Sequence, residues 1–176
     1  MKKVPVSDPP DLSLMDENSQ SRECYAWAGL ALYEAQVLEQ GVLNLLFAAR
    51  VADGSLAREF GSVDAFFGVH GSNTLGQLLN RVKNHVPINQ DVGDKCVLAL
   101  RTRNFLVHEF FVERIELLFT LEGRDQVVGE LHDMAQLFQA ADSLLTDLML
   151  LVARRFGLTE AQIDLEFQAL KAEIGG

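Results

Sequence analysis

Proline is scarce in this sequence: four prolines occur in 176 residues, and Pro87 is the only one beyond residue 20. Proline lacks the backbone N–H that a helix interior or a central strand needs, so it is common in turns. Its scarcity favours long helices over a turn-rich β structure. The share of apolar residues, 48%, is typical of a folded globular chain and not of a disordered one.

Cysteine is nearly absent. Cys24 and Cys96 are the only two, and they form neither a CxxC pair nor any other metal-binding spacing. Cys96 lies in an apolar helical stretch, where a buried free thiol is expected. Such use of cysteine suits a reducing cytoplasm rather than a secreted, disulfide-bonded protein.

Positive charge is also in short supply, since 15 Lys and Arg face 25 Asp and Glu, which gives a net charge of −10. This balance keeps a protein soluble and argues against strong nonspecific binding to nucleic acid. It leaves room for a local basic site.

Long apolar runs are missing. The longest is LMLLVA, 148–153, which is far shorter than a membrane span. The first twenty residues contain two lysines but no apolar run after them, so they do not resemble a secretory signal. We therefore expect a soluble, cytoplasmic protein with no membrane partner.

Apolar residues recur at helical spacing along most of the chain. Residues 1–19 are predicted to be a flexible polar tail and 20–176 a single helical-bundle domain. The fold class is all-α, an up-and-down bundle with three long helices and two or three short ones. Gly41 is expected to mark close packing, and Gly123 to separate two helices. The predicted helices cover 20–52, 62–67, 73–85 with N-cap Asn73, a stretch from Asn89 or Asp91 to about 121, 124–157 with Gly157 as C-cap, and a final stretch from N-cap Thr159.

Several polar residues interrupt the apolar stretch LALRTRNFLVHEFFVERIELLF, 98–119. Polar groups inside an apolar stripe cost folding energy unless they are paired, exposed or in use. On a helical wheel, one polar side carries Thr102, Glu109, Glu113 and Glu116, and the opposite side carries Arg101, Asn104 and His108. Asn104 and His108 are four residues apart, so they can form a hydrogen bond.

Apolar residues cover most of the remaining circumference of this helix, which calls for more cover than one neighbouring helix gives. We therefore predict a homodimer with this helix at the shared surface. Arg103 and His108 are five residues apart, or about 140° around a helix. One helix cannot easily aim both at one small target, whereas two helices from two chains can. The pattern predicts a site formed where two subunits meet.

The segment RNFLVH, 103–108, resembles the signature of the HEPN superfamily of small helical proteins, in which an Arg and a polar residue precede a His after four to six intervening positions. Arg103, Asn104 and His108 match the strict form, and Arg101 matches the looser spacing. The long first helix with EAQVLEQGVLNLL, the helix start TLGQLL and the aromatic pair after the His resemble bacterial members as well. The resemblance covers residues 22–157.

The resemblance implies an HEPN-like bundle and a metal-independent endoribonuclease, often a toxin or defence effector beside a nucleotidyltransferase-like antitoxin. Arg103, Asn104 and His108 would then be catalytic, and Arg101 would bind a neighbouring phosphate of the RNA. The residue types suit RNA cleavage by the 2′-hydroxyl: imidazole exchanges a proton near neutral pH, and guanidinium holds a phosphate and stabilises the charge of the transition state. No metal and no cofactor is implied.

Other interpretations remain open. His108 can be an interior histidine paired with Asn104, and Arg101 and Arg103 can pair with Glu109 or Glu34 and only stabilise the bundle. Glu34 and Glu39 can face the cleft or be solvated. His70, His85 and His132 are expected to be ordinary surface or loop residues. A fainter likeness to the mannitol operon repressor family, in TLGQLLNRV and LALRTRNFLVH, suggests a non-catalytic helical module that binds protein or regulates transcription. Small-ligand binding in the interface cleft is a third interpretation.

Overall fold

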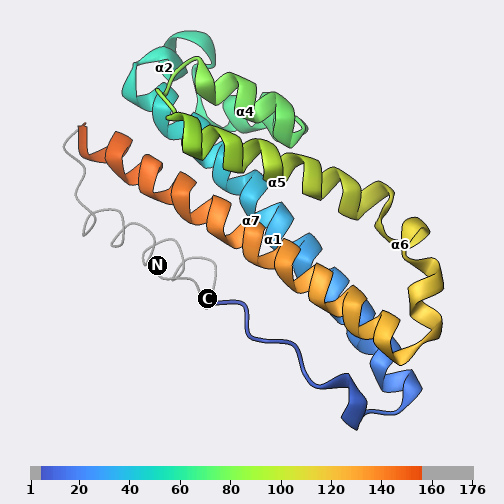
Figure 1. Cartoon of the computed structure of the whole chain (residues 1–176). Helices are drawn as coiled ribbons and strands as arrows, with labels where there is room; N and C mark the ends of the chain where they lie inside the picture. Colours follow the sequence, from blue (N-terminus) through green and yellow to red (C-terminus); the bar gives the residue numbers. More distant parts are fainter. Residues whose placement is uncertain (1–4, 156–176) are drawn as a thin grey trace, which may run out of the picture. The chain divides into compact units, whose positions relative to one another are not determined.

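The computed structural model describes residues 5–155, and within that span every regular element is a helix (Figure 1). The predicted all-α class is therefore confirmed. The predicted helix from Thr159 and the cap at Gly157 lie outside the described residues. The elements are η1 (Leu12–Leu14), α1 (Glu17–Ala52), α2 (Ser55–Glu59), α3 (Val63–His70), α4 (Leu75–Lys83), α5 (Gln90–His108), α6 (Phe110–Glu113), η2 (Ile115–Phe119) and α7 (Leu121–Arg155).

The described residues fall into two compact units. Unit 1 contains 42–87 and 144–155, and unit 2 contains 5–41 and 88–143. The helices α1 and α7 contribute one part to each unit. The predicted division of the chain into a tail and a single domain stays a prediction.

Unit 2 includes part of the segment that we expected to be a tail. Leu12, in η1, is only 1% exposed. The side-chain amide of Gln20 donates hydrogen bonds to the carbonyls of Leu12 (3.0 Å) and Met15 (2.8 Å). Helix α1 begins at Glu17, a few residues before the predicted start. The chain before α1 is thus held against it by both apolar and polar contacts.

The core of unit 2 follows the apolar stripes that the sequence predicts for the three long helices. Gly41 marks close packing, as expected, because a Cβ there would collide with the carboxylate of Asp142, which is buried. The buried apolar residues are Cys24, Trp27, Ala31, Ala35 and Leu38 of α1, Val92, Cys96, Ala99 and Leu106 of α5, and Val127, Val128, Leu131, Ala135, Phe138 and Ala141 of α7.

The central helix is shorter than predicted, because α5 ends at His108 and not near 121. Glu109 adopts φ −128° and ψ −31°, outside the helical region, and α6 and η2 follow in a new direction (Figure 1). The predicted polar side that joins Thr102 to Glu113 and Glu116 therefore does not form. A continuous helix would place Phe105 and Phe110 about 140° apart. The break lets Phe110 turn inward, to 0% exposure, with its ring 5.8 Å from that of Phe105.

Unit 1 contains the short helices α2, α3 and α4 together with the C-terminal part of α1. Thr74, and not the predicted Asn73, is the N-cap of α4, and it forms a capping box with Gln77. This leaves the Asn73 side chain free to contact His70. The core side of α4 carries Leu75, Leu78, Leu79 and Val82.

His70 was expected at the surface, but it is completely buried. Its ring packs at an angle against the rings of Phe60 (5.4 Å) and Phe66 (4.7 Å). The Asn73 amide nitrogen lies 2.9 Å from Nδ1, and since an amide NH₂ only donates, Nδ1 accepts. Nε2 then carries the proton, and it is buried without a hydrogen-bond partner. Burial, followed by the positive charges of Arg81 and Arg50, lowers the pKa of His70.

This environment predicts a loss of stability in mild acid. The pKa of His70 is lower in the folded state than its ordinary 6.5, so the unfolded chain binds more protons as the pH falls below 6.5. The second proton would also have to bind Nδ1, and this would break the hydrogen bond that Nδ1 accepts from Asn73. We expect the free energy of unfolding in urea to be highest above pH 6.5 and to decline below it. The decline should shrink in His70→Gln and persist in the control His108→Gln, whose side chain is exposed. An unchanged decline in His70→Gln contradicts this prediction.

The other two histidines also have partners. His85 Nδ1 lies 2.9 Å from Asp53 Oδ2, and hydrogen bonds from Ser55 and then from His85 lower the pKa of Asp53 to about 2. His132 packs edge-on against Trp27, with ring centroids 5.4 Å apart. Neither is an unpartnered surface histidine.

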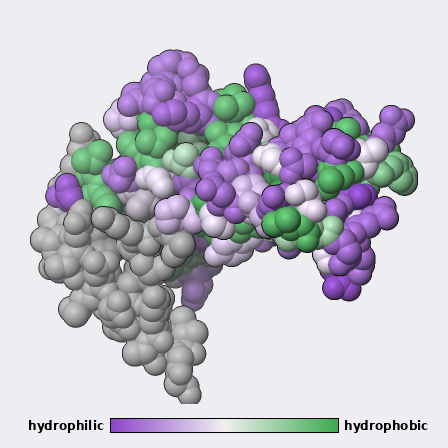
Figure 2. Space-filling model, turned by 60° about the horizontal axis from the view of Figure 1, so that its bottom comes forward, coloured by the Kyte–Doolittle hydropathy of each residue, from purple (hydrophilic) through white to green (hydrophobic). Residues whose placement is uncertain are grey.

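Helix α7 from Leu121 to Arg154 is long and apolar enough to cross a membrane by length and composition, with a mean hydropathy of 1.2 in its best window and 28% of that window buried. The uninterrupted apolar runs of the sequence do not predict this, because polar residues divide the apolar stretches of α7. The core helix of a soluble protein meets the same criterion, so cytoplasmic location stays a prediction. On the face drawn in Figure 2, hydrophobic patches alternate with larger hydrophilic areas.

Candidate functional site

The motif residues lie in the second half of α5. The N-cap of this helix is Asn89, one of the two predicted N-caps, whose side chain accepts a hydrogen bond from the Val92 amide at 2.9 Å. Its buried side packs through Cys96, Ala99 and Leu106. The register that buries these residues leaves an exposed stripe along the helix, which carries Leu98, Arg101, Asn104 and His108.

Arg103 points to the first helix rather than to solvent. Its Nε lies 2.9 Å from Oε1 of Glu39, and the two side chains are 28% and 26% exposed. Oε1 of Glu39 is buried and has no aligned hydrogen bond, so the contact is an ion pair held by charge. The structure thus pairs Arg103 with Glu39, a carboxylate other than the two, Glu109 and Glu34, that we considered as its partners.

Asn104 bonds to the arginine before it and not to the histidine after it. Arg103 Nη1 donates to Asn104 Oδ1 at 3.3 Å. Among residues 5–155, no hydrogen bond or ion pair involves the imidazole of His108, which is exposed at the end of α5. The interior-histidine interpretation, with His108 paired to Asn104, is wrong. The ring is accessible to solvent.

Within one chain, the structure joins Arg103 to Asn104 and to Glu39, and it shows no bond from any of these three to His108. Because α5 is helical from Gln90 to His108, Arg103 and His108 point about 140° apart. Arg101 lies on the same exposed stripe as His108, seven residues earlier, and has no side-chain partner within residues 5–155. Among the described residues, the motif thus offers one paired guanidinium, that of Arg103, and one unpaired guanidinium, that of Arg101.

No family model, curated protein or solved structure matches this chain. The assignment of a function therefore depends on the residues and their geometry alone.

Metal ligation finds no support in the part of the chain that the structure describes. No group of three or more His, Cys, Asp or Glu side chains between residues 5 and 155 is placed to hold a metal ion. The motif itself carries two guanidiniums, an amide and an imidazole, which are groups that recognise a phosphate, and the carboxylate of Glu39 lies beside one of the guanidiniums.

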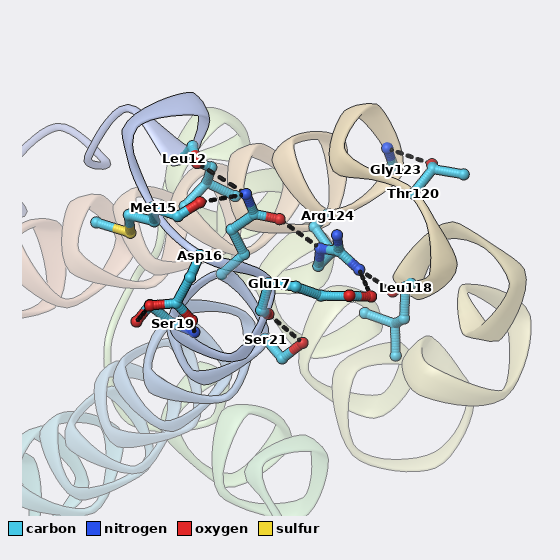
Figure 3. Close-up of polar contacts among 11 residues, drawn as sticks. Leu12, Met15, Asp16, Glu17, Ser19, Ser21, Leu118, Thr120, Gly123 and Arg124 are labelled. Atoms are coloured by element: carbon cyan, nitrogen blue, oxygen red, sulfur yellow. Dashed lines mark hydrogen bonds and ion pairs between the residues drawn. The ribbon is translucent and has the colours of Figure 1, made fainter.

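Arg124, which was not predicted from the sequence, anchors the chain that follows His108. Its side chain is 7% exposed, and its guanidinium donates to Gln20 Oε1 (2.9 Å) and to the Leu118 carbonyl (2.8 Å), with Glu17 at 3.5 Å (Figure 3). One buried arginine thereby ties the start of α7 to the start of α1 and to η2. The only sequence signal for this role is that Arg124 lies in the first turn of α7. A positive charge is unusual there, because the N-terminus is the positive end of the helix dipole.

Proposed function

We propose that this protein is a metal-independent endoribonuclease of the HEPN type, with a site that two copies of the chain complete. The observation that carries the proposal is the exposed stripe of α5, on which Arg101, Asn104 and His108 lie open to solvent. An exposed imidazole that bonds to no side chain in the described part of the chain is available for proton transfer to a substrate. The side chains of Arg101 and His108 have no hydrogen-bond or ion-pair partner among residues 5–155, so no such contact within the described chain accounts for them.

The chemistry follows from the groups present. A 2′-hydroxyl of the RNA loses its proton to an imidazole and attacks the adjacent phosphorus, and the bond to the 5′-oxygen breaks as that oxygen takes up a proton. The products are a 2′,3′-cyclic phosphate and a 5′-hydroxyl. Guanidinium groups stabilise the extra negative charge on the phosphorane oxygens. His108 exchanges the protons, Arg103 binds the reacting phosphate, and Arg101 binds its neighbour.

The test is cleavage of RNA in the presence of EDTA, with detection of cyclic phosphate ends. His108→Ala should lower the rate by about 10²–10⁴-fold, because it removes general acid–base catalysis. Arg103→Ala should lower it by about 10²–10³-fold, because it removes charge stabilisation. His132→Ala and Arg58→Ala are the matched controls and should keep the wild-type rate. Equal trace cleavage by all five proteins would refute the proposal.

A homodimer is part of the proposal, because one chain aims Arg103 and His108 in different directions. If one site takes Arg103 from one copy and His108 from the other, then mixing His108→Ala with Arg103→Ala should restore activity. Statistical exchange makes half of the dimers mixed, each with one complete site of two, so about a quarter of the wild-type activity is expected. Sedimentation should show a dimer, and a monomer that still cleaves RNA contradicts this part.

A non-catalytic helical regulatory module, similar to the mannitol operon repressors, is the second candidate. Exposed apolar side chains directly after the motif favour it: Val112, Ile115 and Phe119 are 76%, 57% and 75% exposed. These residues suit a protein partner. Gel filtration that shows a stable one-to-one complex, unchanged in His108→Ala, together with no cleavage of RNA, would select this candidate.

A further inference from the structure

In the proposed function, Arg103 binds the reacting phosphate. A carboxylate of the same chain, however, already neutralises the charge of this arginine. Glu39 lies on α1, and its Oε1 is 2.9 Å from Nε of Arg103. Both side chains are about three-quarters buried, so water screens the pair less than it screens a surface ion pair. A phosphate that approaches this guanidinium meets the negative charge of Glu39 at the same time.

The geometry of the Arg103–Glu39 pair allows another anion to replace the carboxylate. Oε1 of Glu39 has no aligned hydrogen bond, so the contact is electrostatic and lacks the bidentate geometry of the strongest arginine–carboxylate pairs. Asn104 holds Nη1 at 3.3 Å independently of Glu39. The guanidinium therefore keeps one positional anchor when the carboxylate charge is removed.

We propose that Glu39 is an intrinsic competitor of phosphate at Arg103, so that the ion pair holds the site in a low-affinity state until a phosphate of the RNA displaces the carboxylate. The inference rests on the proposed function, because it regulates the site that the function requires. It assigns Glu39 an inhibitory role, opposite to that of a residue that positions Arg103 for catalysis.

A second ion pair in unit 2 provides a matched control. Arg114 Nε lies 2.8 Å from Oε2 of Glu130, and both side chains are 26% exposed. Glu130→Gln removes the same charge from a pair of similar length and burial that includes none of Arg101, Arg103, Asn104 and His108. Any gain in RNA binding that comes only from the lower net negative charge should appear equally in Glu39→Gln and Glu130→Gln.

The experiment measures binding of the full chain to a fluorescein-labelled single-stranded oligonucleotide whose 2′-O-methyl groups block cleavage. Glu39→Gln should bind about three- to ten-fold more tightly than Glu130→Gln at low salt, the gain expected from one freed charge near a phosphate. Its slope of log K against log salt concentration should steepen by about 0.7, the value for one more phosphate contact on a single strand. Arg103→Met in the Glu39→Gln background should abolish the gain, and urea unfolding should show that each variant is folded.

The outcomes separate the inference from the function. If Glu39→Gln binds no better than Glu130→Gln, or binds more weakly, while wild-type cleavage still needs Arg103 and His108, the inhibitory role is wrong and the function stands. If no variant binds or cleaves RNA, both are wrong. If Glu39→Gln binds more tightly than Glu130→Gln through Arg103, and wild-type cleavage needs Arg103 and His108, both are supported.

Discussion

Replacing Phe110 with Ala is expected to lower the free energy of unfolding by about 3–5 kcal/mol, the range for removal of a buried phenyl ring. Phe110 is 0% exposed, and its ring contacts those of Phe105 at 5.8 Å and Phe111 at 5.4 Å. The Arg114 guanidinium lies over the rings of Phe105 and Phe110, at 5.5 and 5.9 Å. The substitution removes the common member of this cluster, and with it the reason for α5 to end at His108.

Urea unfolding monitored by circular dichroism measures this effect. Phe119→Ala is the control, because that ring is 75% exposed in the same segment and its removal should change stability by less than about 0.5 kcal/mol. Phe110→Leu keeps most of the volume and should cost much less than Phe110→Ala. If Phe110→Ala and Phe119→Ala have similar stabilities, packing by Phe110 is not what ends the helix.

The long helices α1 and α7 were predictable because their apolar stripes repeat over many turns. A stripe with a period of 3.6 residues that continues for 30 residues has no other common explanation. The start of α5 after Asn89 was predictable for a local reason, since an N-cap side chain bonds to the amide of its own helix. These features depend on residues close together in the sequence.

The end of α5 was not predictable in this way. Glu109, Phe110 and Arg114 are all compatible with a helix, and no glycine or proline marks the break. The break depends on the packing of Phe110 against neighbours that come together only in the folded chain. Local propensity was overridden by tertiary burial.

The site shows the same division between local and tertiary information. The exposure of Asn104 and His108 follows from the register of α5, that is, from which side of the helix is buried. The helical wheel of residues 98–119 predicts this register approximately. The pairing of Arg103 with Glu39 joins two helices far apart in the sequence, and the wheel of one helix contains no information on it. The burial of His70 was missed because its segment, with several glycines, shows no periodic pattern.

Gly123 and Gly129 lie two turns apart in α7, and their replacement by Ala is expected to change stability in opposite directions. A Cβ at Gly123 would collide with the Leu117 carbonyl oxygen and lie 2.7 Å from Leu117 Cα, which are backbone atoms that cannot rotate away. The Gly123 amide also donates to Thr120 Oγ1 at 3.0 Å, which fixes the first turn of α7 in place. Gly123→Ala should therefore destabilise the protein by about 1–3 kcal/mol, the usual cost of overpacking.

Gly129 has no atom within 4 Å of the position that a Cβ would take. Ala there only reduces the freedom of the unfolded chain and improves helix propensity, so Gly129→Ala should stabilise by about 0.5–1 kcal/mol. Thermal unfolding of the two variants beside wild type measures both signs in one experiment. If both Gly123→Ala and Gly129→Ala stabilise the protein, the prediction is wrong. In that case η2 can move away from α7, and the contact between Leu117 and Gly123 does not constrain the chain after His108.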